Sequence, residues 1–189
     1  MLMTTSTLTP ATIDDLALVD GKAELVAGKI VTFMPSGYVP SAVAFEIAIH
    51  LREFARSRGR GKAFADGLGY ALPIPLLNGR QSFMPDASFH LGPFPRNVMK
   101  FVIGTPTFAV EVRSEGDVGP AAERAMADKR DDYFEAGTVA VWDVDPETET
   151  IYLYTPNEPA NPIAFRKGNV AHAEPALPGW RLAVDDVFA

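Results

Sequence analysis

The sequence contains no cysteine and only three histidines. The lack of cysteine excludes disulfides, thiolate-bound metals and cysteine nucleophiles. His50, His90 and His172 are too scattered along the chain to suggest a zinc site. The chain also has no G-x-x-x-x-G-K-[ST] loop, G-x-G-x-x-G fingerprint, H-E-x-x-H pair or G-x-S-x-G setting for a serine nucleophile. The common nucleotide-binding, zinc-peptidase and serine-hydrolase motifs are therefore all missing.

Long apolar runs are missing as well. No stretch approaches the roughly 18 apolar residues that a membrane-spanning helix needs, and residues 1–10 lack a basic region followed by an apolar one. We therefore expect a soluble, cytoplasmic protein. Its 189 residues, 47% of them hydrophobic, suffice to bury the core of a single domain spanning residues 1–189.

Basic residues are fewer than acidic ones, 17 against 24, which gives a net charge of −7. This balance weighs against nucleic-acid binding. The charge is polarised, because residues 1–110 carry 10 basic and 8 acidic groups whereas residues 111–189 carry 7 and 16. One basic run is a candidate phosphate-contacting patch, although such a run is usually a solvated helix end. It consists of Arg52, Arg56, Arg58, Arg60 and Lys62.

Residues 120–136 are predicted to form a helix, since Pro120 suits its first position and Gly137 its end. At about 100° per residue, Lys129 falls on the apolar stripe of this helix, and every other charge lies off the stripe. A lysine on an inward face must either extend to solvent along its stem or meet an anion. Both interpretations of Lys129 remain open at this point.

Two strand-like segments supply the anions. Residues 83–90 and 108–114 alternate between apolar and polar positions, with Asp86 on the first segment and Glu111 on the second. If the strands are neighbours, the two carboxylates and the backbone carbonyl of Val112 could hold one hard cation such as Mg²⁺. The alternative is structural: Asp86 makes a turn after Pro85, and Glu111 forms a surface pair with Arg113.

The order of elements predicts an α/β fold, a mixed sheet flanked by helices. Residues 40–56 form a long helix in this prediction, with Phe45 and Ile49 as a second contact surface and a candidate dimer interface. Hairpins are expected at residues 23–34 and 139–154, an irregular strand pair at 59–80 and a proline-rich loop at 156–162.

Several segments together resemble one known family. They are AELVAGKIVTFMPS from Ala23, PTFAVEVRSEGD around Glu111, the K-x-x-x-Y spacing of Lys129 and Tyr133, AVWDVDPETETIYLY, and LPGWRLAVDDVF. This combination is similar to the Uma-two family of endonucleases within the PD-(D/E)XK nuclease superfamily, and it covers nearly the whole chain. The resemblance implies a restriction-endonuclease-like fold.

The resemblance also implies roles for individual residues. Asp86 and Glu111 would be metal ligands, Lys129 the superfamily's lysine displaced onto the following helix, and Glu24 an accessory acid. Arg113 stands where the superfamily usually has lysine; an arginine cannot act as a base but can hold a phosphate or stabilise charge. The family commonly has a histidine where this chain has Val39-Pro40-Ser41.

We therefore expect an endonuclease that uses Mg²⁺ or Mn²⁺ to hydrolyse DNA and acts as a homodimer, because cutting two strands needs two sites. RNA and branched or damaged DNA are alternative substrates. A catalytically inactive dimeric module of the same fold, binding nucleic acid or protein, is the competing hypothesis. The acidity, Arg113 and the missing histidine favour that module.

Overall fold

The computed structural model describes residues 9–189, and its centre is a six-stranded sheet with the order β11-β10-β9-β8-β6-β3. Strands β8 and β9 are parallel and the other neighbours are antiparallel, so the sheet is mixed. Its strands are β3 (Lys62–Ala65), β6 (Ala87–His90), β8 (Phe108–Val112), β9 (Ala140–Asp145), β10 (Thr150–Thr155) and β11 (Glu158–Phe165).

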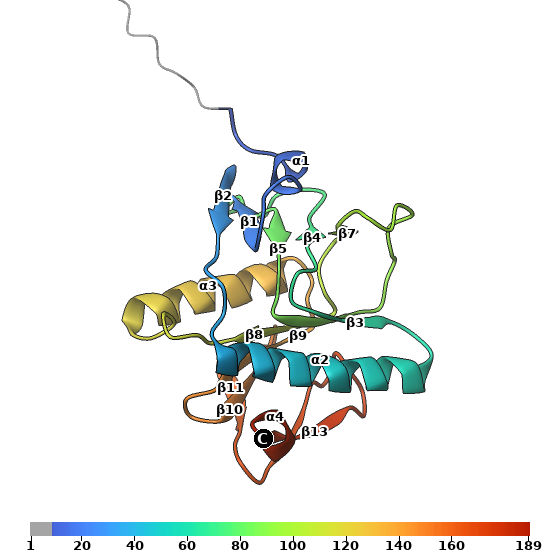
Figure 1. Cartoon of the computed structure of the whole chain (residues 1–189), viewed down its shortest axis with the longest axis vertical. Coiled ribbons are helices and arrows are strands. Elements are labelled where there is room, and N and C mark those ends of the chain that lie inside the picture. The colour runs from blue at the N-terminus through green and yellow to red at the C-terminus, as the bar shows by residue number, and fades with distance from the viewer. Residues whose placement is uncertain (1–8) are drawn as a thin grey trace, which may run out of the picture.

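Two helices cover opposite faces of this sheet (Figure 1). On one face, α2 (Tyr38–Arg58) packs Val43, Ile47 and Leu51 against the sheet. On the other face, α3 (Pro120–Glu135) contributes the fully buried Tyr133. The alternation along β8 follows from the two-residue period of a strand: Val110 packs on the α2 side and Ala109 on the α3 side. The predicted mixed α/β fold is confirmed.

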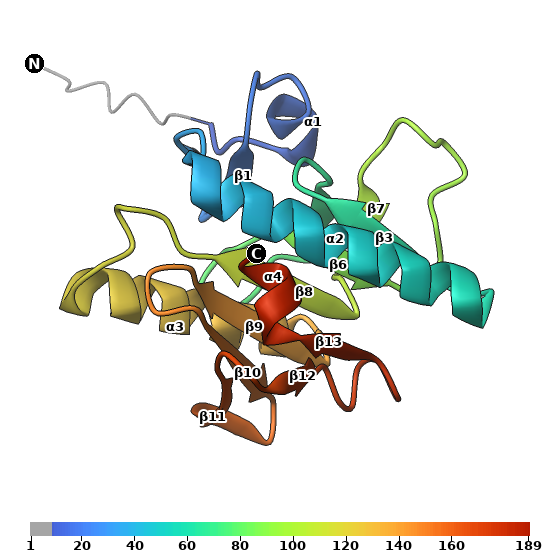
Figure 2. The same ribbon diagram turned by 60° about the horizontal axis from the view of Figure 1, so that its bottom comes forward.

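Within the described part of the chain, three small sheets surround this centre. The hairpin of β1 (Ala23–Val26) and β2 (Lys29–Thr32) forms a sheet of its own, preceded by the short helix α1 (Ile13–Leu16). A second sheet has the order β5-β4-β7, from Ser82–Phe83, Tyr70–Ala71 and Val102–Ile103. The third pairs β12 (Val170–His172) with β13 (Arg181–Ala183), which leads into α4 (Val184–Val187) beside α2 (Figure 2).

Several local predictions were wrong. The segment expected as one strand over residues 83–90 is broken at Pro85, and its two parts belong to different sheets. No two strands within residues 59–80 pair with each other, because β3 pairs with β6, and β4 pairs with β5 and β7. The turn around residues 77–79 is nevertheless closed by the backbone hydrogen bond from Leu76 to Arg80. The expected loop at 156–162 lies largely in β11. Strand β11 is an edge strand, where proline costs no central ladder hydrogen bond.

The expectation about a secretion signal rests mostly on residues 1–8, which lie outside the described residues. Within residues 9–189, no helix combines the length and apolarity that crossing a bilayer requires.

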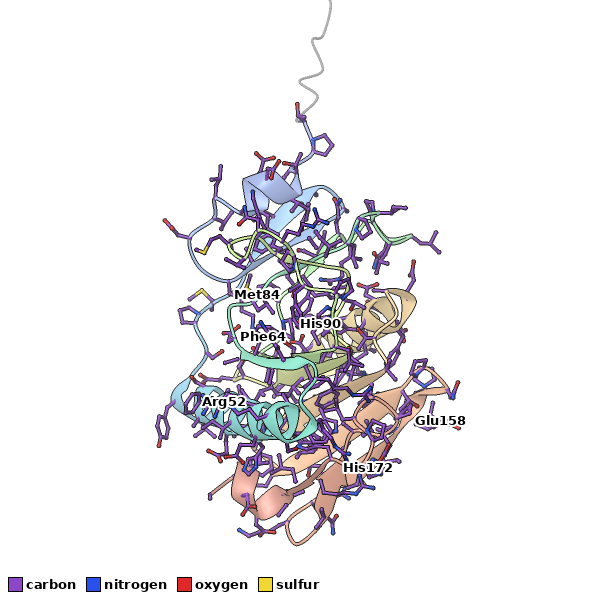
Figure 3. The ribbon with its side chains drawn as sticks, turned by 90° about the vertical axis from the view of Figure 1, so that its right-hand side faces the viewer. Arg52, Phe64, Met84, His90, Glu158 and His172 are labelled. Atoms are coloured by element: carbon purple, nitrogen blue, oxygen red, sulfur yellow. The ribbon has the colours of Figure 1, made fainter. Side chains whose placement is uncertain are left out.

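We expect Ile47→Ala to lower the free energy of unfolding by about 3 kcal/mol, because it leaves a cavity under α2 where Ile47 is fully buried. Arg52→Ala is the matched control on the same helix, since Arg52 is exposed and extends from α2 (Figure 3). It should change the free energy by less than about 0.5 kcal/mol. Urea denaturation measures both, and similar losses in the two variants would contradict this packing.

Candidate active site

A cavity of about 530 Å³ is lined by residues of the β1–β2 hairpin, β8 and α3. Glu24 reaches it from β1, Asp86 from the segment before β6, Glu111 from β8 and Lys129 from α3. The structure therefore brings together four residues that the sequence singles out.

Lys129 joins two of the acids. Its ammonium nitrogen lies 2.9 Å from Oε1 of Glu111 and 3.0 Å from Oε1 of Glu24, and its side chain is 17% exposed. Burial works to lower the pKa of Lys129, but the two carboxylates outweigh this and raise the pKa above its usual value. Lys129 is thus a fixed positive charge at neutral pH and no base. It meets anions inside the cavity instead of extending to solvent.

Glu111 receives a second donor, the hydroxyl of Tyr133, at 2.6 Å from the same oxygen Oε1. Burial raises the pKa of Tyr133 well above its usual value, so the phenol stays protonated and donates. Burial also raises the pKa of Glu111; Lys129 opposes this rise, whereas the nearby Asp86 adds to it. Lys129 and Tyr133 both engage Oε1, and the second oxygen, Oε2, lies outside these two contacts.

Glu24 is almost completely buried and is held from three sides. Its carboxylate accepts from Arg80 Nη1, from the backbone N–H of Met84 at 3.0 Å and from Lys129. Met84 is labelled in Figure 3. Burial works to raise the pKa of Glu24, but Lys129 and Arg80 together lower it below its usual value. Arg80 in turn donates to Asp132 on α3 at 2.6 Å, so this network ties the hairpin to the helix.

Asp86 lies directly after the break at Pro85, where its side chain can turn toward β8. Its Oδ2 accepts the backbone N–H of Val112 at 2.7 Å, and its Oδ1 accepts from the ammonium of Lys22. Lys22 also lies 3.0 Å from Oδ1 of Asp66. Val112 lines the same cavity. Its N–H thus positions Asp86, and the metal-ligand role of its carbonyl stays a prediction.

The family model of Uma2, described as "Putative restriction endonuclease", matches residues 13–185. The chain belongs to the Uma2 family. The resemblance noted from its sequence segments is thereby confirmed.

A solved structure shows the same fold as this Uma2 family member. It is the crystal structure of "a putative nuclease belonging to DUF820" from Anabaena variabilis ATCC 29413. The TM-score is 0.71 at 20% sequence identity, and the match covers 95% of this chain and 98% of the other. No curated protein matched the chain. The membership supports a nuclease-like function, and the solved structure shows the shared fold.

Arg113 lines the cavity, but carboxylates hold its guanidinium. Its Nε and Nη2 donate to Asp143 at 2.7 and 3.0 Å, and its Nη1 donates to Glu123 at 2.5 Å. The hydrogen bonds with Asp143 raise the pKa of Arg113 far above its usual value. The alternative of a surface pair between Glu111 and Arg113 is wrong, because Arg113 pairs with Asp143 and Glu123.

Sequence reasoning missed several charged residues that line the cavity, namely Lys22, Arg80, Asp117, Arg130 and Asp143. Tyr133 was noted only for its spacing from Lys129, and not as a residue that binds Glu111. Tyr133 had a usable signal, because it follows Lys129 by one helical turn on the same stripe. Arg130 lies off the stripe yet is buried, since it donates to Asp143 at 2.9 Å. Lys22 and Arg80 lie outside helices and strands, where no periodic pattern marks an inward side chain. The basic run from Arg52 to Lys62 contributes no lining residue to the cavity.

The carboxylates of Asp86 and Glu111 are ligands that suit a hard cation, but they are only two. Within residues 9–189, no group of three or more histidines, cysteines or acids is arranged to hold a metal ion. Two carboxylates with water are nevertheless enough for Mg²⁺, which usually keeps several waters. The ammonium of Lys22 binds Asp86, and its charge also acts on Glu111, so this position already accommodates a cation. The residues present therefore fit a divalent metal.

We expect Lys129→Met to lower the free energy of unfolding by about 3 kcal/mol at pH 8, because the buried Glu24 and the partly exposed Glu111 lose their shared cation. The loss should be smaller at pH 4.5. The pKa of Glu111 is raised, so the folded protein loses stability as the pH rises and Glu111 becomes charged. Toward acid pH Glu111 is increasingly protonated and has less need of the ammonium of Lys129. Part of the loss should remain there, because the pKa of Glu24 is lowered.

Thermal or urea unfolding at the two pH values measures this difference. The matched control is Arg124→Met, an exposed cation on the same helix, which should stay within about 0.5 kcal/mol of wild type at both pH values. An equal loss for Lys129→Met at pH 8 and pH 4.5 would argue against Glu111 as the group that Lys129 neutralises.

Proposed function

We propose that this protein is a metal-dependent endonuclease that hydrolyses phosphodiester bonds of DNA. The observation that carries the proposal is the meeting of Asp86, Glu111 and Lys129 in one cavity. The Uma2 membership supports a nuclease-like function. Asp86 and Glu111, with the carbonyl of Val112, would hold Mg²⁺ or Mn²⁺. When bound, the metal would lower the pKa of a coordinated water and neutralise a phosphate oxygen.

The charge balance of the cavity favours a metal requirement. Five basic and five acidic side chains from residues 9–189 line it, so without metal these residues offer no excess positive charge to a phosphate. The basic members are Lys22, Arg80, Arg113, Lys129 and Arg130, and the acidic members are Glu24, Asp86, Glu111, Asp117 and Asp143. A divalent cation would tip the local balance toward the anionic substrate despite the net charge of −7.

The protein's own residues would then act by position and charge. The ammonium of Lys129 would stabilise the charge that grows on the phosphate or orient the attacking water. Because its pKa is raised, Lys129 donates hydrogen bonds and takes no proton. Tyr133 holds one oxygen of Glu111 in place. Glu24, as an accessory acid, keeps Lys129 inside the cavity.

The test is cleavage of supercoiled plasmid in Mg²⁺ or Mn²⁺. We expect Asp86→Asn and Lys129→Met each to reduce the rate by at least about 100-fold, the order expected for losing one electrostatic group of an active site. Asp128→Asn is the matched control, because Asp128 is exposed on α3 beside Lys129. It should leave the rate unchanged. Equal rates in all four proteins would identify a contaminating nuclease.

The competing function is a module of the same fold that binds nucleic acid or protein without cleaving it. The observation in its favour is Arg113, which replaces the superfamily's usual lysine and is fully engaged with Asp143 and Glu123. Calorimetry with Mn²⁺ separates the two. Absence of uptake that depends on Asp86 and Glu111 favours the module, whereas such uptake together with plasmid nicking favours the enzyme.

A homodimer is part of the proposal, because a double-strand cut needs two sites. Phe45 on α2 is 61% exposed, which supports the candidate interface with Ile49. We expect Phe45→Glu to convert a dimer into a monomer in sedimentation velocity, with Glu53→Gln on the same helix as the control. A monomeric wild-type protein would contradict this assignment.

A further inference from the structure

Lys22 lies where the proposed metal would bind, and the proposed reaction gives it no role. It precedes β1, its side chain is 18% exposed, and it lines the cavity beside Asp86 and Glu111. Its ammonium contacts Oδ1 of Asp86 directly. The negative charges of Asp86 and Glu111 both raise the pKa of Lys22, so its ammonium interacts with both proposed metal ligands.

The two oxygens of Asp86 have different partners. Oδ2 accepts the backbone N–H of Val112, which is fixed because Val112 belongs to the central sheet. Oδ1 accepts from the ammonium of Lys22, which is carried on a flexible four-carbon stem. An incoming cation can therefore bind Oδ1 of Asp86 by displacing the side chain of Lys22, while the backbone stays in place. A divalent cation and an ammonium at the same oxygen would repel each other strongly, so simultaneous binding is disfavoured.

Asp66 offers Lys22 a second position. Its Oδ1 lies 3.0 Å from the same ammonium, and its side chain is 48% exposed. Asp66 lines a separate, smaller cavity of about 140 Å³ that Asp86 also borders, together with Ser36 and Ser41. Asp66 does not line the larger cavity. An ammonium that leaves Asp86 can thus keep an ion pair with Asp66, outside the position of the metal.

We propose that Lys22 and the divalent metal exchange at Asp86. Without metal, the ammonium bridges Asp86 and Asp66 and neutralises the acid at the cavity; with metal, Asp66 alone holds it. This inference rests on the proposed function, because it takes Asp86 as a metal ligand. It makes Lys22 and Asp66 positioning residues that set metal affinity with opposite signs.

The experiment is titration of each purified protein with Mn²⁺ by calorimetry at one pH and salt concentration. Lys22→Met removes the competing charge and should tighten Mn²⁺ binding at least about tenfold. Asp66→Asn removes the second position, which makes displacement of Lys22 less favourable, and should weaken binding several-fold. Lys22→Arg keeps the positive charge and can donate two hydrogen bonds to Asp86, so it should also weaken Mn²⁺ binding. Lys29→Met, an exposed lysine on the same hairpin, should bind as wild type does.

The double variant decides whether Asp66 acts through Lys22. With Lys22→Met in place, adding Asp66→Asn should change the affinity less than twofold, because no ammonium needs a second position. A further loss in the double variant would make Asp66 a metal ligand itself and overturn the exchange. Unchanged or weaker binding by Lys22→Met would overturn it too. If Lys22→Met does not fold, the weakening expected for Lys22→Arg and Asp66→Asn still tests the inference.

Failure of the proposed function gives a different pattern. If neither the wild type nor Lys22→Met takes up Mn²⁺ in a manner that Asp86→Asn abolishes, the metal site is wrong and the exchange falls with it. If the wild type takes up Mn²⁺ through Asp86 but Lys22→Met does not bind it more tightly, only the exchange is wrong and the nuclease proposal stands.

Discussion

The ammonium of Lys129, shared by Glu24 and Glu111, is the interaction on which the site depends. It connects three segments that the central sheet alone would not join: the separate β1–β2 hairpin, strand β8 and helix α3. A two-stranded hairpin is marginal by itself in water, so its position must come from contacts with the rest of the fold. Arg80, which binds both Glu24 and Asp132, adds a second ion pair between hairpin and helix. The same charges that shape the cavity thus fix the hairpin that forms its wall.

The parts of the site that sequence reasoning found are those that a periodic element presents. Glu111 follows from the alternation in β8, and Lys129 follows from the stripe of α3. Asp86 was also found from the alternation expected over residues 83–90, although that segment is broken at Pro85 and Asp86 lies directly before β6. Lys22 and Arg80 could not be found in this way. Their positions depend on how distant segments pack, and neither lies in a helix or strand.

The fold shows the same division. Both long helices and the β9–β10 hairpin follow local rules and were predicted close to their observed ends. The errors concern pairing between residues far apart in the sequence. Strand β3 pairs with β6, 22 or more positions further along the chain, and Ala63 and Phe89 of these strands pack in the same core. Strand β11 was missed because Pro159 and Pro162 argue for a loop, whereas an edge strand tolerates both.

Asp143 explains why an arginine stands two residues after Glu111. In the parallel pairing of β8 and β9, Glu111 and Asp143 are direct neighbours, and two adjacent carboxylates on one face repel each other. Arg113 and Arg130 together place three hydrogen bonds on the two oxygens of Asp143. A guanidinium at position 113 can hold both of those oxygens at once, which the single ammonium of a lysine does less well. Asp143 is then neutralised by arginine. Glu111 binds Lys129 and Tyr133 through Oε1, and its Oε2 lies outside these contacts, where the proposed metal would bind.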